Sequence, residues 1–198
     1  QVTDRVIFLD EGDIVDVTTL GVRITDATGR DVQRPIERLS EAADHADKGV
    51  FRHYMLKEIH EQPRAIANTL RGRIGEDHIY EQAFGVAADE VFAHVAAVQI
   101  VACGTSYHSG LVARYWIEEH VGIPCAVEIA SEFRYRKLVV ADNTLFVTIS
   151  QSGETADTLA ALRLAHTLGY RSTLTICNAP QSSLVRESHL AIMTEAGA

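Results

Sequence analysis

The sequence predicts an α/β protein with a doubly wound parallel sheet of five strands, preceded by helices and a short β-rich segment. Apolar runs rich in β-branched residues recur through the C-terminal half, and segments with helical periodicity separate them. Strands that are apolar throughout are typical of a sheet that helices cover on both faces. Their alternation with helices indicates parallel strands joined by right-handed crossovers.

Residues 1–45 alternate short apolar runs with turn sequences, which is the pattern of a β-meander. A few short strands bury too little apolar area to be stable alone, so we expect this segment to be the edge of a larger domain. The expected strands are residues 6–9, 14–17 and 22–24, with turns at 10–13 and 26–30.

A linker is expected at residues 44–50, and helical periodicity begins after it. Apolar residues recur at helical spacing from Tyr54 to Leu70, and Pro63 is placed near the first turn of a second helix within this stretch. Residues 88–93 are expected to form another short helix.

The strands of the sheet are expected from residue 98 onward. Helices should lie between them at residues 107–120, ended by Gly122, at a short stretch through Phe133, and at residues 155–168. Gly169 is the expected left-handed residue after the last of these helices. The expected strands are residues 98–103, 125–129, 144–149, 172–177 and 190–194.

Charge and hydropathy exclude several classes of function. The net charge of −9 argues against a nucleic-acid groove or an anionic membrane surface, because both need clustered Lys and Arg. No apolar run approaches the length of a membrane span, and residues 1–5 are too polar for a signal peptide. Since Gln1 is not an initiator Met, we expect that the chain begins inside a longer protein or has been processed or cut.

The cysteines and histidines predict neither a disulfide framework nor a metal site. Cys103, Cys125 and Cys177 are odd in number, lack a CxxC pair and adjoin apolar runs, so we expect reduced, mostly buried thiols of a cytosolic protein. His60 is followed by Glu61, but Arg64 stands where the second His of HExxH would be. No metal and no cofactor are therefore expected.

Small hydroxyl residues and glycines follow the first and third strands, at residues 104–110 (Gly-Thr-Ser-Tyr-His-Ser-Gly) and 150–155 (Ser-Gln-Ser-Gly-Glu-Thr). Ligands of doubly wound sheets bind outside the carboxyl ends of the strands. A helix that starts there presents free N–H groups and a positive dipole end to an anion. Neither loop contains Lys, GxxxxGK[ST] or GxGxxG, so a phosphomonoester fits better than a nucleoside triphosphate.

Simple helix capping is the alternative for these loops. Ser and Thr are ordinary N-cap residues, and a lone Ser-Gly turn before a helix usually does no more than cap it. Because two such loops occur on one sheet, a phosphate or sugar site is as well supported as capping.

Cys103, at a strand end, could be a nucleophile, but no base is near in sequence and a small buried thiol is favoured.

Three longer motifs stand out: residues 103–106 (Cys-Gly-Thr-Ser), 128–136 (Glu-Ile-Ala-Ser-Glu-Phe-Arg-Tyr-Arg) and 150–158 (Ser-Gln-Ser-Gly-Glu-Thr-Ala-Asp-Thr). They resemble the bacterial glutamine–fructose-6-phosphate aminotransferases (isomerizing), also called glucosamine-6-phosphate synthases. Residues 48–63 are similar to the interdomain segment of that family, and the resemblance covers essentially the whole chain.

The resemblance implies a glutaminase domain followed by two sugar-isomerase (SIS) domains of flavodoxin-like fold. Residues 1–45 then correspond to the C-terminal remnant of the glutaminase domain. Residues 46–95 correspond to a linker and lead-in helices, and residues 96–198 to most of the first SIS domain. The apolar run at residues 138–140 is expected to contact another SIS domain, and a homodimer is expected for the full-length enzyme.

The resemblance also implies the ligand, a sugar phosphate such as fructose 6-phosphate or glucosamine 6-phosphate. The parent enzyme, which is expected in the cytoplasm, transfers ammonia from glutamine to fructose 6-phosphate and isomerises the product, a precursor of UDP-N-acetylglucosamine. Matched motif by motif, the residues that hold the sugar phosphate are Ser150, Gln151, Ser152 and Thr155, with Cys103, Gly104, Thr105 and Ser106 close by.

No catalytic residue is expected in these 198 residues. The family hydrolyses glutamine with an N-terminal Cys, whereas this chain starts with Gln1, and the isomerase acid–base residues and Schiff-base Lys belong to the second SIS domain. The fragment alone should therefore be inactive. The alternative is a non-catalytic SIS module that senses phosphosugars in a regulator, but the strand-rich N-terminal segment is unlike the DNA-binding helices of such proteins.

Overall fold

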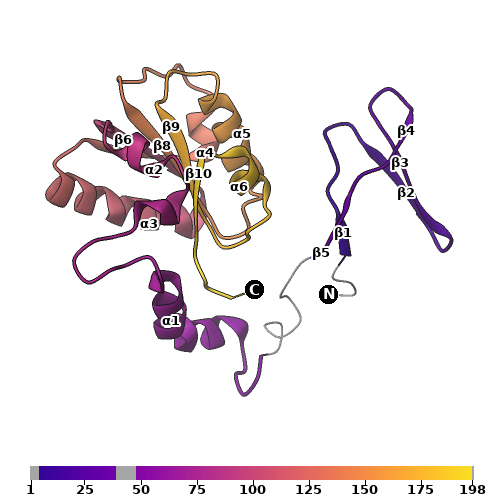
Figure 1. The fold of residues 1–198 in the computed structure, drawn as a ribbon, viewed down its shortest axis with the longest axis horizontal. Coiled ribbons are helices and arrows are strands. Elements are labelled where there is room, and N and C mark those ends of the chain that lie inside the picture. The colour runs from indigo at the N-terminus through magenta and orange to yellow at the C-terminus, as the bar shows by residue number, and fades with distance from the viewer. Residues whose placement is uncertain (1–4, 39–47, 198) are drawn as a thin grey trace. The chain divides into compact units, whose positions relative to one another are not determined.

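The computed structural model describes residues 5–38 and 48–197 (Figure 1). The chain divides into two compact units, one that extends up to Arg52 and another that spans His53–Gly197. Within the described ranges, no helix is long and apolar enough to cross a membrane.

Two small antiparallel sheets make up the described part of the first unit. The strands expected at residues 14–17 and 22–24 pair in a meander, whereas the strand expected at residues 6–9 lies in the other sheet. Ile24 is the one buried apolar residue among those described in this unit, so burial of apolar surface stabilises it little. The two-stranded sheet pairs β1 (Arg5–Ile7) with β5 (Ile36–Arg38). The meander consists of β2 (Ile14–Thr18), β3 (Gly21–Thr25) and β4 (Asp31–Val32).

The second unit begins with α1 (Tyr54–Leu70), a single helix that contains Pro63. The expectation that a second helix starts at Pro63 is wrong. Proline has a φ close to the helical value, so the helix can continue through it, although the position lacks the N–H for a backbone bond and the ring crowds the carbonyl one turn earlier. After α1 come η1 (Glu81–Phe84) and α2 (Ala88–Phe92), and the latter confirms the short helix expected at residues 88–93.

Five parallel strands form the sheet of the second unit in the order β10-β9-β8-β6-β7. The chain runs from β6 outward to β7 and then returns to β8 on the other side of β6. Strand order therefore reverses between β6 and β8. The strands are β6 (Ala97–Ala102), β7 (Cys125–Ile129), β8 (Thr144–Ser150), β9 (Ser172–Cys177) and β10 (Leu190–Met193).

Helices cover both faces of this sheet, which confirms the doubly wound architecture (Figure 1). One face packs against α2 and α3, and the other against α4, α5 and α6. The helices between strands are α3 (Gly104–Trp116), α4 (Ala130–Phe133), α5 (Ala156–Ala165) and α6 (Ser183–Glu187). A π-helical turn, Ile117–Val121, continues α3 as far as Gly122, whose φ of 75° ends it as predicted.

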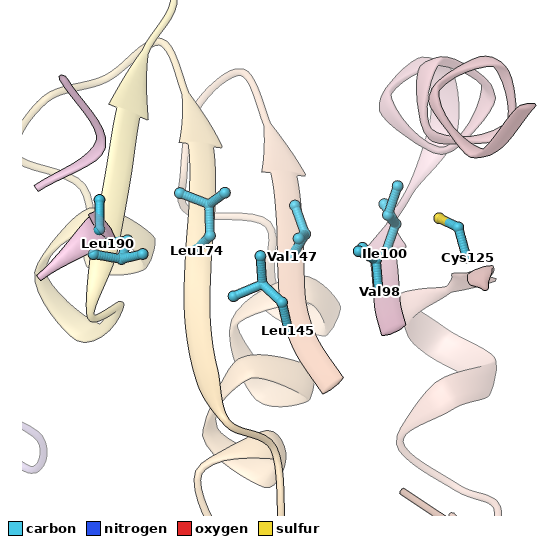
Figure 2. Close-up of a cluster of buried hydrophobic side chains, with 8 residues drawn as sticks. Val98, Ile100, Cys125, Leu145, Val147, Leu174 and Leu190 are labelled. Carbon is cyan, nitrogen blue, oxygen red and sulfur yellow. The ribbon is translucent and has the colours of Figure 1, made fainter. Parts of the chain in front are cut away.

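Alternate residues of the central strands enter two separate cores, because successive side chains of a strand point to opposite faces. Figure 2 shows the core on the α2 and α3 side, where Val98, Ile100, Val147 and Leu174 gather. On the other face, Phe146 is fully buried. Both faces are buried, and polar residues of the central strands such as Thr148 and Thr175 are buried too, so these strands do not alternate between apolar and exposed polar residues.

Two helices differ in extent from the sequence prediction. The helix α3 starts at Gly104 instead of Tyr107, because Gly104 has a φ of 56° and turns the chain out of the strand within one residue. The helix α5 ends at Ala165 instead of residue 168. The next N–H groups bond three residues back, Thr167 to Leu164 at 2.9 Å and Leu168 to Ala165 at 3.0 Å, and Gly169 is not left-handed.

Candidate functional site

The two predicted loops meet at the reversal of strand order. On the neighbouring strands β6 and β8, Ala102 is paired with Ile149, so Cys103 and Ser150 come next on adjacent strands. In open α/β sheets the ligand crevice lies outside the carboxyl ends of the strands at this switch point. The fold therefore brings residues 103–106 and 150–155 together where such sheets bind ligands.

Hydrogen bonds shape the second loop from within. Ser150 ends β8 and is buried; its Oγ accepts a bond from the N–H of Gly153 at 3.0 Å and lies 3.4 Å from Oγ1 of Thr155. The exposed Ser152 accepts a bond from the N–H of Glu154 at 3.2 Å. Three hydroxyl groups are thus held in one tight turn. The exposed Gln151 is in the same turn, and its carbonyl oxygen accepts a bond from the N–H of Asn178 at 3.2 Å.

Neither helix at the switch point has a side-chain cap. Thr155 is the N-cap residue of α5 and Cys103 that of α3, and neither makes a side-chain capping bond. Capping alone therefore does not account for the hydroxyl of Thr155. The helices have 13 and 10 residues; α3 follows β6 after Cys103 alone and α5 follows β8 after residues 151–155, so their positive dipole ends lie at the carboxyl edge of the sheet.

The first loop is tighter than the sequence suggests, because Gly104, Thr105 and Ser106 form the first turn of α3. Gly104 and Thr105 are exposed and Ser106 is half-buried. A Cβ at Gly104 would meet nothing within 4 Å, so glycine is required here by the backbone conformation and not by lack of space.

A contact that the sequence did not reveal joins the first loop to α5. The fully buried Thr158 of α5 donates a weak hydrogen bond from Oγ1 to Sγ of Cys103 at 3.9 Å. Cys103 is half-buried, and with this contact it packs the first turns of α5 against the end of β6. The two residues are 55 positions apart, and no local pattern links them.

Two carboxylates close to the second loop in sequence are engaged by other groups. Asp157, in the first turn of α5, accepts a bond from Nη1 of Arg134 at 2.9 Å. Glu154 Oε1 accepts a bond from the N–H of Ser183 at 2.7 Å. Arg134 belongs to the motif at residues 128–136, but nothing in the sequence pairs it with Asp157. The Arg134 guanidinium offsets part of the negative charge that an anion would meet here.

Gly153 fixes the loop by close packing. It has a φ of 66°, and a Cβ there would lie 2.0 Å from Oγ of Ser182, in the segment between β9 and α6. The missing side chain of Gly153 thus lets the β9–α6 segment pack against the loop.

Other ionisable groups with altered pKa values lie away from these loops. Burial raises the pKa of the Cys125 thiol to about 11, and burial with the nearby Glu128 carboxylate raises the pKa of Tyr170 to about 12. Tyr170 lines a cavity of about 180 Å³ beside the amino ends of β6 and β8, opposite the loops. No cluster of three metal-ligating side chains occurs in the described part of the chain.

The chain is similar in sequence to known proteins along its whole length. The glutamine–fructose-6-phosphate aminotransferases [isomerizing] of Pseudomonas aeruginosa and Escherichia coli K12 are 60% identical over 197 residues and 58% identical over 196 residues. These alignments cover 100% and 99% of this chain and 32% of each relative. The chain thus spans about a third of the length of these relatives.

A solved structure is also similar, the C-terminal domain of glucosamine-fructose-6-phosphate aminotransferase from Francisella tularensis. It is 53% identical with a TM-score of 0.74, and the match covers 77% of this chain and 43% of that one. The family profile described as "SIS domain" matches residues 92–198, more than half of the chain and the part that contains both loops. This chain therefore belongs to the SIS domain family.

Proposed function

We propose that this chain is the sugar-phosphate-binding part of a glutamine–fructose-6-phosphate aminotransferase (isomerizing). The proposed ligand is fructose 6-phosphate or glucosamine 6-phosphate. The observation that carries the proposal is the meeting of two helix N-termini, without side-chain caps, at the switch point of the sheet. The residues proposed to hold the phosphate are Ser150, Gln151, Ser152 and Thr155, with Cys103, Gly104, Thr105 and Ser106 beside them.

The donors of the two loops suit a phosphomonoester. Residues 103–106 and 150–155 contain no Lys or Arg, so hydroxyl and backbone N–H groups must bind the anion. A phosphomonoester has a charge of about −1.5 to −2 at neutral pH. Each hydrogen bond to such a charged oxygen contributes about 1.5–3 kcal/mol, and the N-terminus of a helix adds a favourable dipole.

The relatives' name supplies the proposed parent activity, transfer of the glutamine amide nitrogen to fructose 6-phosphate. We propose that the parent enzyme is a homodimer, which the exposed Val139 supports, and that it is cytoplasmic, which the free thiols support.

A polypeptide of these 198 residues should release no glutamate from glutamine and form no glucosamine 6-phosphate. Turnover of either kind by the pure polypeptide would contradict this. A phosphosugar-sensing regulator is less well supported, because the first unit is built from antiparallel strands.

Calorimetry with fructose 6-phosphate tests the site. Ser152→Ala should weaken binding by tenfold or more, since about 1.4 kcal/mol is a factor of ten. Ser152→Asp should weaken it further, because its carboxylate repels the phosphate. Affinity should rise as pH increases through about 6, where the phosphate loses its second proton.

Thr167→Ala is the matched control, because this hydroxyl bonds to the carbonyl of Leu164 at the opposite end of α5. Its affinity should equal that of the wild type. If Ser152 only stabilises its turn, Ser152→Ala lowers stability by about 1 kcal/mol and leaves affinity unchanged. Equal affinities of the wild type and all the variants for fructose 6-phosphate would show that the phosphate does not bind to this loop.

A further inference from the structure

Glu154 is an acidic residue inside the anion-binding loop, yet its carboxylate is bonded to a neighbouring helix. Glu154 Oε1 accepts the N–H of Ser183 at 2.7 Å, and the carbonyl oxygen of Gly153 accepts the N–H of Leu184 at 3.1 Å. Ser183 and Leu184 are the first two residues of α6. The loop thus makes two hydrogen bonds to the start of this helix.

The start of α6 has no cap of its own. Ser182 is its N-cap residue but makes no side-chain capping bond, and its Oγ lies 3.4 Å from Sγ of Cys177 instead. A helix N-terminus leaves four backbone N–H groups without partners inside the helix. Two of those in α6 are bonded to Gly153 and Glu154, so the loop caps the helix.

The far end of α6 is fastened as well. Glu187 accepts two bonds of 2.9 Å from Arg163, and its carbonyl oxygen lies 2.8 Å from Nε2 of His166. Arg163 and His166 lie at the C-terminal end of α5, the helix that starts at the loop. Hydrogen bonds therefore connect the loop to α6, and α6 to the far end of α5. The loop cannot move relative to these two helices without breaking one of these hydrogen bonds.

We infer that Glu154 is a positioning residue, whose carboxylate fastens the phosphate-binding loop to α6 and so holds the hydroxyls of Ser152 and Thr155 in place. The inference rests on the proposed function. A simpler electrostatic effect predicts the opposite sign. If Glu154 were only a negative charge beside the phosphate, its removal would tighten binding, because like charges repel.

Two substitutions separate these effects by calorimetry of fructose 6-phosphate with the 198-residue chain. Glu154→Ala loses the bond to Ser183 and should weaken binding by roughly fivefold or more, because a displaced loop loses charge-assisted hydrogen bonds to the phosphate. Glu154→Gln keeps an oxygen that can accept the same N–H, and should bind within about twofold of the wild type. Tighter binding by both variants would overturn the inference.

Glu118→Ala is the matched control. Glu118 also accepts a backbone N–H from another element, that of Cys125 at 3.4 Å, and it pairs with Arg114 far from the loop. This variant should lower the melting temperature and leave the affinity unchanged. A similar loss of affinity in Glu118→Ala and Glu154→Ala would assign the effect to general destabilisation and would overturn the inference.

Amide hydrogen exchange of the ligand-free chain tests the positioning role of Glu154 independently of the proposed sugar-phosphate binding. The amides of residues 152–155 and of Ser183 should exchange faster in Glu154→Ala than in the wild type, and not in Glu154→Gln. Unchanged exchange in Glu154→Ala would overturn the inference even if the loop binds phosphate. If the wild type binds no sugar phosphate, the proposed function fails, and the exchange rates alone decide whether Glu154 fixes the loop.

Discussion

Replacement of Gly153 by alanine perturbs the loop in two ways that the structure separates. The residue has a φ of 66°, a conformation that side chains with a Cβ rarely adopt. The added Cβ would lie 2.0 Å from Oγ and 2.4 Å from Cβ of Ser182, and 2.8 Å from Sγ of Cys177. The substitution therefore strains the backbone and overpacks the contact between the loop and the β9–α6 segment.

Each effect has a known magnitude. A left-handed conformation costs a residue with a side chain about 1–2 kcal/mol. Overpacking of a close contact adds about 1–3 kcal/mol, so Gly153→Ala should lower the free energy of unfolding by about 2–5 kcal/mol. Domains are stable by about 5–15 kcal/mol, so the variant should fold with a clearly lower melting temperature.

Urea denaturation with two further variants tests this. Gly122 has a φ of 75° and nothing within 4 Å of its added Cβ, so Gly122→Ala should lose only the backbone part, about 1–2 kcal/mol. Adding Ser182→Gly to Gly153→Ala should restore part of the stability, because the contact is relieved. Equal losses in Gly153→Ala and Gly122→Ala, with no recovery in the double variant, would refute the close packing of the loop.

Three further predictions concern residues outside the loop. Phe146→Ala should lower the free energy of unfolding by about 3–5 kcal/mol in urea, because its ring is fully buried between Phe133 and Tyr170; a loss below about 1 kcal/mol would contradict this packing. Burial raises the pKa of Cys125 to about 11, so iodoacetamide at pH 8 should label it slowly in the native chain and rapidly in urea; fast native labelling would show that it is accessible. The hydrogen bond from Arg163 lowers the pKa of Glu187 below its usual 4.5, so this pair stabilises the fold above that pH and is lost as pH falls through the lowered value. Because the pair is partly exposed, it should contribute only about 0.2–1 kcal/mol. Between pH 7 and pH 3 the free energy of unfolding should therefore fall by about that much more in the wild type than in Glu187→Gln, as measured by thermal melting at each pH. Identical pH profiles for the two proteins would contradict this.

The sheet could be predicted from the sequence because its three central strands, β6, β8 and β9, are buried along nearly their whole length. Residues 144–149 are apolar or β-branched throughout, residues 172–177 are so after Ser172, and polar residues bound both runs, so the strands were located to within one residue at most ends. Helix ends were predicted less well. The continuation through Pro63 and the early start at Gly104 each depend on the backbone conformation of a single residue, which the hydrophobic pattern does not reveal.

The candidate loops could be predicted because ligands of such sheets bind after the strands, but their closeness depended on strand order. Nothing in the sequence shows that β6 and β8 are neighbours. The bonds that fix the loop join residues distant in sequence, such as Glu154 with Ser183, 29 positions apart, and Arg134 with Asp157, 23 positions apart. Such pairs depend on how helices pack, and a single sequence with no alignment has no signal for them.

An amide NMR titration of the 198-residue chain with fructose 6-phosphate tests the proposed phosphate site most directly, with inorganic phosphate titrated in parallel. Binding at the switch point predicts that both ligands shift the amides of Ser106 and of residues 152–157 most. The sugar phosphate should cause the larger change at equal concentration. Shifts confined to the cavity beside Tyr170, or shifts in the loop that are equal in the wild type and Ser152→Asp, would contradict the assignment of the phosphate to this loop.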